Sequence, residues 1–222
     1  MDTCKNNMFL FFVICVVVFP QFAQSSYNIA LGKPAAQSST TGGWVANKAV
    51  DGVIGKDFES SGGGSCSSTS DHGEPEAWWR VDLQQMTRIK SINITYRELY
   101  PFRLSGFHLY VANTTAMNNL SNTGHLCYHD NTRDPALPSF NQSRPCNVDG
   151  RYVIFYNKRP ADNGPKSHVY YSTTEAVVEL CEVQVFGCPM NTFGPTCYTP
   201  CHCGRGGCDP DTGICDVIGC QR

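Results

Sequence analysis

The chain has 222 residues and a formal net charge of −2, and only 16% of its residues are charged. An apolar fraction of 41% excludes a disordered tail, and the near-neutral charge gives no electrostatic basis for binding nucleic acid. The thirteen cysteines indicate maturation in an oxidising compartment. A chain of this length accommodates one medium-sized domain with a small appendage.

Residues 1–25 are typical of a secretory signal peptide. The apolar run Met8–Pro20 follows a stretch with a single lysine, and the small residues Ala23 and Ser25 occupy the positions that a signal peptidase reads. As a helix this run spans about 20 Å, less than the roughly 30 Å of a bilayer's hydrocarbon core. We therefore predict a secreted product, unless the chain was cut from a longer cell-surface receptor that carries an anchor downstream.

Residues 26–187 are predicted to form an all-β domain. Apolar and polar residues alternate with period two at Ile92–Arg97 and Phe107–Val111, as in half-buried strands. Further strands are expected at Trp78–Leu83, Tyr152–Tyr156 and Val177–Phe186, between turn-rich connections. The pattern predicts an antiparallel β-sandwich or jelly roll.

Four Asn-x-Ser/Thr sequons predict a glycoprotein. They fall on outward strand positions or in loops, where a glycan would reach solvent, at Asn93, Asn113, Asn119 and Asn141.

The cysteines divide the chain into two regions. The sandwich region contains four, which predicts two bridges: Cys66 with Cys181, between the opening loop and the final strand, and Cys127 with Cys146, across a surface loop. Residues 188–222 contain seven, a density typical of a small disulfide-rich module. Because seven is odd, Cys220 either has a partner beyond Arg222, remains a free thiol or forms an intermolecular bridge.

The C-terminal run CPMNTFGPTCYTPCHCGRGGCDPDTGIC resembles the EGF/laminin-type repeats of multiple-EGF scavenger receptors. The resemblance implies the pairs Cys188–Cys197, Cys201–Cys208 and Cys203–Cys215. Zinc at Cys201 and Cys203 is the competing interpretation, but an oxidising compartment favours disulfides.

Residues 27–187 resemble the F-type lectin (fucolectin, eel agglutinin) family, which is related in fold to discoidin domains. Six segments carry the resemblance: YNIALGKPAAQSS at 27–39, NKAVDG at 47–52, GSCSST at 64–69, AWWRVDL at 77–83, DGRYV at 149–153 and LCEVQVFG at 180–187. Each segment is weak alone, and their order and spacing together are specific.

The resemblance implies a Ca²⁺ site. Its ligands would be two carboxylates, one serine and main-chain oxygens, from Asp51, Glu182, Ser65, Lys48, Val53 and Cys181. This donor count suits calcium, which takes six to eight oxygens. The alternative is that Asp51 only begins an Asx turn and that Glu182 is a solvated edge charge.

The resemblance also implies a fucose-type sugar site built from a histidine and two arginines, since imidazole and guanidinium groups donate directed hydrogen bonds to neutral hydroxyls. The arginines match Arg97 and Arg103. Ser68 stands where the family has its histidine, so His72 is the candidate substitute. Leu99 replaces the family aspartate, and the neighbouring Glu98 is the candidate to orient a guanidinium group.

Two functions remain open. One is a secreted, calcium-dependent lectin for fucosylated or related glycans on cell surfaces, with oligomeric state undetermined. The other is a non-lectin recognition module of a scavenger-receptor-like protein, in which the altered loops bind a protein or lipid ligand or the domain only caps an array of EGF-like repeats. No nucleophile elbow, HExxH motif or P-loop is present, so the sequence predicts no enzyme.

Overall fold

The computed structural model describes residues 27–55, 64–72, 74–132, 135–159, 175–203 and 207–216. The predicted signal segment 1–25 and Cys220 lie outside these ranges. Within them, no helix has the length and apolar character needed to cross a membrane.

The regular elements of the described chain are mostly β-strands. Its strands and short helices are, in order, β1 Ala35–Gln37, the 3-10 helix η1 Ala46–Val50, β2 Ser67–Ser68, β3 Glu76–Tyr96, α1 Pro101–Leu104, β4 His108–Ala112, α2 Leu120–Thr123, β5 His125–His129, β6 Asn141–Lys158, β7 Glu179–Pro189, β8 Thr192–Phe193 and β9 Thr199–Pro200.

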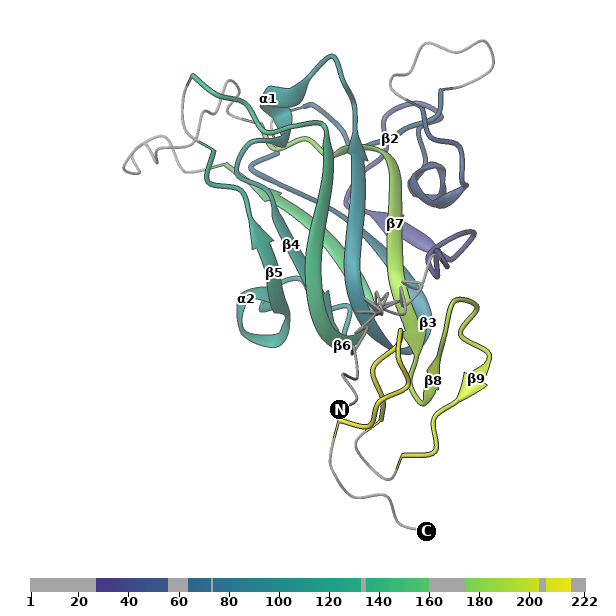
Figure 1. Cartoon of the computed structure of the whole chain (residues 1–222). Helices are drawn as coiled ribbons and strands as arrows, with labels where there is room; N and C mark the ends of the chain where they lie inside the picture. The colour runs from purple at the N-terminus through teal and green to yellow at the C-terminus, as the bar shows by residue number, and fades with distance from the viewer. Residues whose placement is uncertain are drawn as a thin grey trace, which may run out of the picture.

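Two long strands, β3 and β6, run through both layers of an antiparallel sandwich (Figure 1). In one layer, the first half of β3 lies between β1 and β6, and β6 is followed by β4 and β5. In the other, the second half of β3 pairs with β7 on one side and with the first half of β6 on the other. The predicted antiparallel sandwich is thereby confirmed.

The prediction of separate strands at 78–83 and 92–97 was wrong, because one strand contains both. The β3–β6 register shifts between Asp82 and Thr87, and Gln84 takes a φ of 68° in this bend. The exposed residues Gln84–Met86 sit at the bend, so their missing apolar alternation reflects a change of layer and not the end of the strand.

The core lies between the two layers. Trp79 and Phe155 enter it from one layer, and Ile92, Ile94 and Val183 enter from the other, all nearly inaccessible to water. These positions alternate with outward polar residues along β3, as the period-two pattern predicts. The indole N–H of buried Trp79 donates to the Ala46 carbonyl at 2.9 Å, which attaches η1 to the core.

Five disulfides join the two pairs predicted from the cysteines of the sandwich and the three pairs implied by the EGF/laminin-type resemblance. Cys66–Cys181 links the segment before β2 to β7. Three further disulfides crosslink the segment after Gly187. That segment packs against the end of the sandwich opposite α1 (Figure 1).

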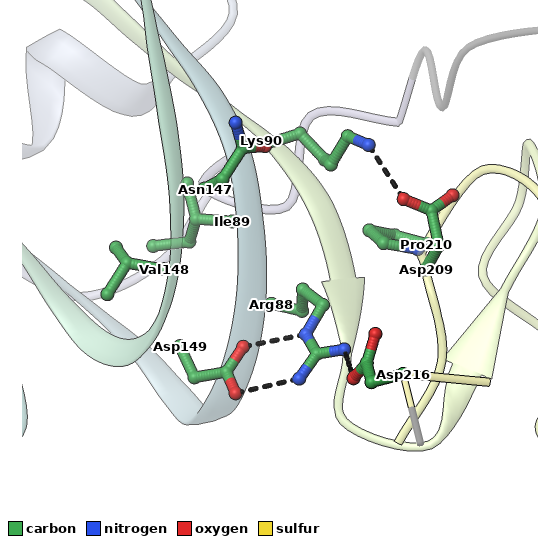
Figure 2. Close-up of a pocket in the computed structure, with 9 residues that line it drawn as sticks. All are labelled: Arg88, Ile89, Lys90, Asn147, Val148, Asp149, Asp209, Pro210 and Asp216. Carbon is green, nitrogen blue, oxygen red and sulfur yellow. Dashed lines mark hydrogen bonds and ion pairs between the residues drawn. The ribbon is translucent and has the colours of Figure 1, made fainter. Parts of the chain in front are cut away.

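Ion pairs between β3 and the C-terminal segment hold the two together. Arg88 makes a bidentate pair with Asp149 of β6 at 2.8 and 2.9 Å and also contacts Asp216 (Figure 2). It donates a further hydrogen bond to the Cys208 carbonyl. Lys90 lies 2.8 Å from Asp209.

Candidate functional site

Two arginines and one buried glutamate meet at the end of the sandwich that carries α1. Arg97 directly follows β3, Arg103 lies in α1, and Glu179 begins β7. Both guanidinium groups donate through Nη1 to the same carboxylate oxygen, Glu179 Oε1, at 2.9 Å each. Glu179 is 1% exposed, whereas the side chains of Arg97 and Arg103 are 14% and 17% exposed. The carboxylate therefore fixes both arginines from below while they keep a surface open to solvent.

Tyr100 lies between the two arginines in the chain and against both in space. The Arg97 and Arg103 guanidinium carbons are 4.2 and 4.8 Å from the centre of its ring. The Phe102 ring meets the Tyr100 ring edge-on at 5.6 Å. The arrangement places an apolar surface beside the hydrogen-bond donors.

Asp71 and His72 border the arginine pair. Asp71 lies 3.6 Å from Arg103 and 3.7 Å from the imidazole of His72, which is 86% exposed. The structure thus brings the three sugar-site candidates His72, Arg97 and Arg103 into one neighbourhood, with the imidazole at its open edge.

Helix α1 is held in place by side chains from β6 and from the residue after it. The main-chain oxygen of Arg103 accepts hydrogen bonds from Asn157 Nδ2 at 2.7 Å and from Arg159 Nη2 at 3.0 Å. Arg159 is 2% exposed and also donates to the Ser105 carbonyl. A one-turn helix would be unstable alone, so these contacts position Arg103.

Both arginines of the site have carboxylate partners. Arg97 and Arg103 face Glu179, Arg103 also faces Asp71, and burial raises the pKa of Glu179 against the lowering effect of the two arginines. Arg103 Nε and Glu179 Oε2 are buried and have no hydrogen-bond partner among the described residues. Such a site suits a neutral ligand rich in hydroxyl groups, because directed donors are present and both arginines already have carboxylate partners.

Glu179 is the residue that the sequence reasoning missed. The sequence suggested Glu98 as the carboxylate that orients a guanidinium group, and the structure gives Glu179 this role for both arginines. The signal was two glutamates, Glu179 and Glu182, within the apolar run VVELCEVQVF, since a buried carboxylate needs a partner.

The six residues proposed for calcium lie in one neighbourhood. The Gly52 amide, between Asp51 and Val53, donates to Glu182 Oε2 at 3.3 Å. Ser65 packs against Gly55, and the Cys66–Cys181 bridge joins the next residue to the one before Glu182. Lys48 belongs to η1, which contacts β7.

The donor set fits a hard cation, although it is not made of side chains alone. Glu182 is 1% exposed, its Oε1 has no hydrogen-bond partner among the described residues, and burial together with the charge of Asp51 raises its pKa to about 7. The Asx turn is also present, since Asp51 Oδ1 accepts the Val53 amide at 2.8 Å. In the described ranges no three His, Cys, Asp or Glu side chains form a metal-binding group, so main-chain oxygens and Ser65 would complete the shell.

The sandwich and the arginine site at its α1 end are those of a galactose-binding-like β-domain. A family model described as a NedA-like, galactose-binding domain matches residues 48–155. Fucolectin-5 of Anguilla japonica is 33% identical over 165 residues, which cover 71% of this chain and 75% of the relative. Fucolectin-1 of the same species is 32% identical, with coverage of 71% and 79%. The chain therefore belongs to the fucolectin, or F-type lectin, family.

Solved structures agree with this assignment. The f-lectin from striped bass (Morone saxatilis) serum aligns with a TM-score of 0.54 and 27% identity over 74% of this chain, which spans about half (48%) of that lectin. The lectin domain of lectinolysin, solved with Lewis B antigen, gives a TM-score of 0.54 and 26% identity, covering 73% of this chain and 98% of that one. The relatives are lectins and sugar-binding modules, in agreement with the prediction that the chain is not an enzyme.

Proposed function

We propose that this protein is a secreted, calcium-dependent lectin. It binds fucose or a related terminal sugar at the end of the sandwich that carries α1. The observation that carries the proposal is the pair of arginines fixed by one buried carboxylate, with Tyr100 beside them. The names of the relatives point to the same sugar, since they are fucolectins and a lectin domain complexed with Lewis B antigen.

The binding step is reversible and involves no bond cleavage. The solvent-facing parts of the Arg97 and Arg103 guanidinium groups would donate to sugar hydroxyls and the ring oxygen, and Glu179 fixes the orientation of both groups. The Tyr100 and Phe102 rings receive the apolar, methyl-bearing face of the sugar. His72 supplies a further donor or acceptor from the open edge. Affinity at one site of this kind is weak, and several copies on a surface raise it.

Calcium would be held by Asp51 and Glu182 with Ser65 and the main-chain oxygens of Lys48, Val53 and Cys181. Bound there, the ion would offset the negative charge of the two nearby carboxylates. Its position beside the Cys66–Cys181 bridge would stiffen the segment that leads to Asp71 and His72.

The segment after Gly187 is proposed to be an EGF/laminin-type module. Its support is the three disulfides in the pairing that the resemblance implies, together with its lack of long strands and helices in the described residues. The module lies at the end of the sandwich opposite the arginines, so a stalk on that side would leave the sugar site free (Figure 1).

A glycan array with the secreted chain, read with and without Ca²⁺, tests the proposal. We expect binding to fucosylated glycans that free L-fucose competes, and loss of that binding in Arg97→Ala and Arg103→Ala. Arg151→Ala is the matched control, because this arginine also pairs with a carboxylate, Asp82, on the sheet surface. If no glycan signal were competed by L-fucose, the non-lectin alternative would replace this proposal.

A further inference from the structure

Two of the four sequons face each other across paired strands. Asn93-Ile94-Thr95 lies in β3 and Asn141-Gln142-Ser143 lies in β6. The antiparallel register sets Asn93 opposite Ser143 and Thr95 opposite Asn141. Because directly opposed and alternate residues of paired strands share one face, both asparagines project from the same side of this layer. The sequence alone gave no sign of this, since 48 positions separate the two sequons.

The two asparagines share one open hollow. It has a volume of about 340 Å³, and the outward residues that line it are Asn93, Thr95, Asn141, Ser143 and Gln184. Asn93 and Asn141 are diagonal neighbours, for which Cα atoms of antiparallel strands lie about 7–8 Å apart. A glycan is bulky and needs solvent around it, so two chains rooted this closely would compete for the same space.

The two amides differ in their access to solvent. Asn141 is the first residue of β6 and is exposed. Asn93 is half-buried near the end of β3, paired with β6 on one side and with Gln184 of β7 on the other. Its Oδ1 is buried and has no hydrogen-bond partner among the described residues. A glycan therefore leaves the surface freely from Asn141, whereas at Asn93 it would rise from a half-buried position between two paired strands and crowd both of them.

We propose that this hollow holds a single N-linked glycan, attached to Asn141, and that Asn93 stays unmodified in the folded, secreted protein. In the transfer, Asn141 Nδ2 attacks the anomeric carbon of a polyprenyl-diphosphate-linked oligosaccharide. A C–N bond forms, the C–O bond to the diphosphate breaks, and the amide loses one proton. The first sugar then covers the hollow and supplies the donor that Asn93 Oδ1 lacks.

The glycan is attached before the chain folds. Folding therefore determines which of the modified chains mature and are secreted. Chains that carry the sugar at Asn141 keep the β3–β6–β7 surface closed, whereas chains modified at Asn93 must open it. The assignment is independent of the sugar-binding site, because none of the residues that line the hollow belongs to the arginine cluster.

Site mapping by mass spectrometry tests the assignment. The full chain is secreted from eukaryotic cells and deglycosylated enzymatically in ¹⁸O-water, so that each formerly glycosylated asparagine becomes a labelled aspartate. We expect label at Asn141 and none at Asn93. Ser143→Ala removes only the Asn141 sequon, and Thr95→Val removes only the Asn93 sequon and keeps the side-chain shape. Ser143→Ala should lose one glycan without gaining label at Asn93, and Thr95→Val should leave the glycan number unchanged.

Label at Asn93 in the wild type or in Ser143→Ala would overturn the assignment, as would an unlabelled Asn141. If a variant is not secreted, the wild-type map still decides, because it requires no substitution.

Discussion

The buried carboxylate oxygen Oε1 of Glu179 accepts a hydrogen bond from Arg97 at 2.9 Å, and Arg103 donates to the same atom at the same distance. The two donors come from the end of β3 and from α1, whereas the acceptor begins β7. Three separate parts of the chain are thus tied at one atom, and the orientation of both guanidinium groups depends on it.

Replacing Glu179 with glutamine should weaken sugar binding while the protein stays folded. Glutamine keeps the volume but removes the negative charge, so both arginines lose their ion pair with residue 179, and we expect at least about tenfold weaker binding and about 1–3 kcal/mol lower stability. Titration calorimetry with L-fucose and thermal unfolding measure both effects. Glu76→Gln makes the same chemical change at an exposed carboxylate that pairs with Lys158, and it should leave the affinity within about twofold.

Much of the fold could be predicted from the sequence because period-two alternation survives wherever a strand has one buried face. Ile92 and Ile94 are buried as this pattern requires. The bend of β3 at Gln84–Met86 could not be predicted, since all three residues are exposed and their sequence resembles that of a loop. For the site, Arg97 and Arg103 could be located by resemblance. The role of Glu179 could not be predicted, because it depends on the pairing of β7 with the end of β3. The two contacting segments are about 80 residues apart in the chain.

Calcium should stabilise the protein through Asp51 and Glu182. If the ion binds only the folded state, about a hundredfold excess over its dissociation constant adds about 2.7 kcal/mol, a shift of roughly 5–10 °C in Tm. Calorimetry in millimolar Ca²⁺ and in EDTA measures this difference. Glu182→Gln and Asp51→Asn should remove the response, whereas Glu76→Gln, at an exposed carboxylate paired with Lys158, should keep it. An identical Tm in Ca²⁺ and EDTA would contradict the proposed site.

The C-terminal module should loosen when Arg88 is replaced by methionine. This substitution removes the pair with Asp149, the contact with Asp216 and the bond to the Cys208 carbonyl, and it leaves two carboxylates without their cation (Figure 2). Hydrogen exchange of residues 188–203 and 207–216 should accelerate by about tenfold or more, in line with charged hydrogen bonds worth about 2 kcal/mol. Arg151→Met removes a bidentate pair with Asp82 and should leave exchange in the module unchanged.

Acid should weaken the sandwich through His108. Burial, and then the neighbouring His129, whose ring stacks on it at 3.9 Å, lower the pKa of His108 to about 4 from its usual 6.5. Between these values the unfolded chain binds a proton that the folded chain does not. Stability is therefore lost as the pH falls from about 6.5 to about 4, and the loss levels off below that.

Tyr110 and Tyr156 are the other titratable groups whose rings meet His108. Both are neutral in this range, since the ordinary pKa of tyrosine is about 10 and burial raises it further. His108→Gln should flatten the pH dependence of unfolding by urea by about 1–2 kcal/mol, since part of the ring remains open to water. His125→Gln, at an exposed position of β5, is the control and should keep the wild-type slope.

Gly187 should tolerate no side chain, because the backbone of β3 lies directly against it. Its φ is +153°, and a Cβ would lie 2.1 Å from the Arg88 carbonyl oxygen and 2.9 Å from Ile89 Cα. Both contacts are with backbone that is paired on either side, so neither can move away cheaply. Gly187→Ala should cost about 3 kcal/mol, or roughly 6–12 °C in Tm. Gly43→Ala, where a Cβ meets nothing within 4 Å, should leave the Tm nearly unchanged. A Gly187→Ala protein as stable as the wild type would mean that β3 and β7 are farther apart at this point than the structure places them.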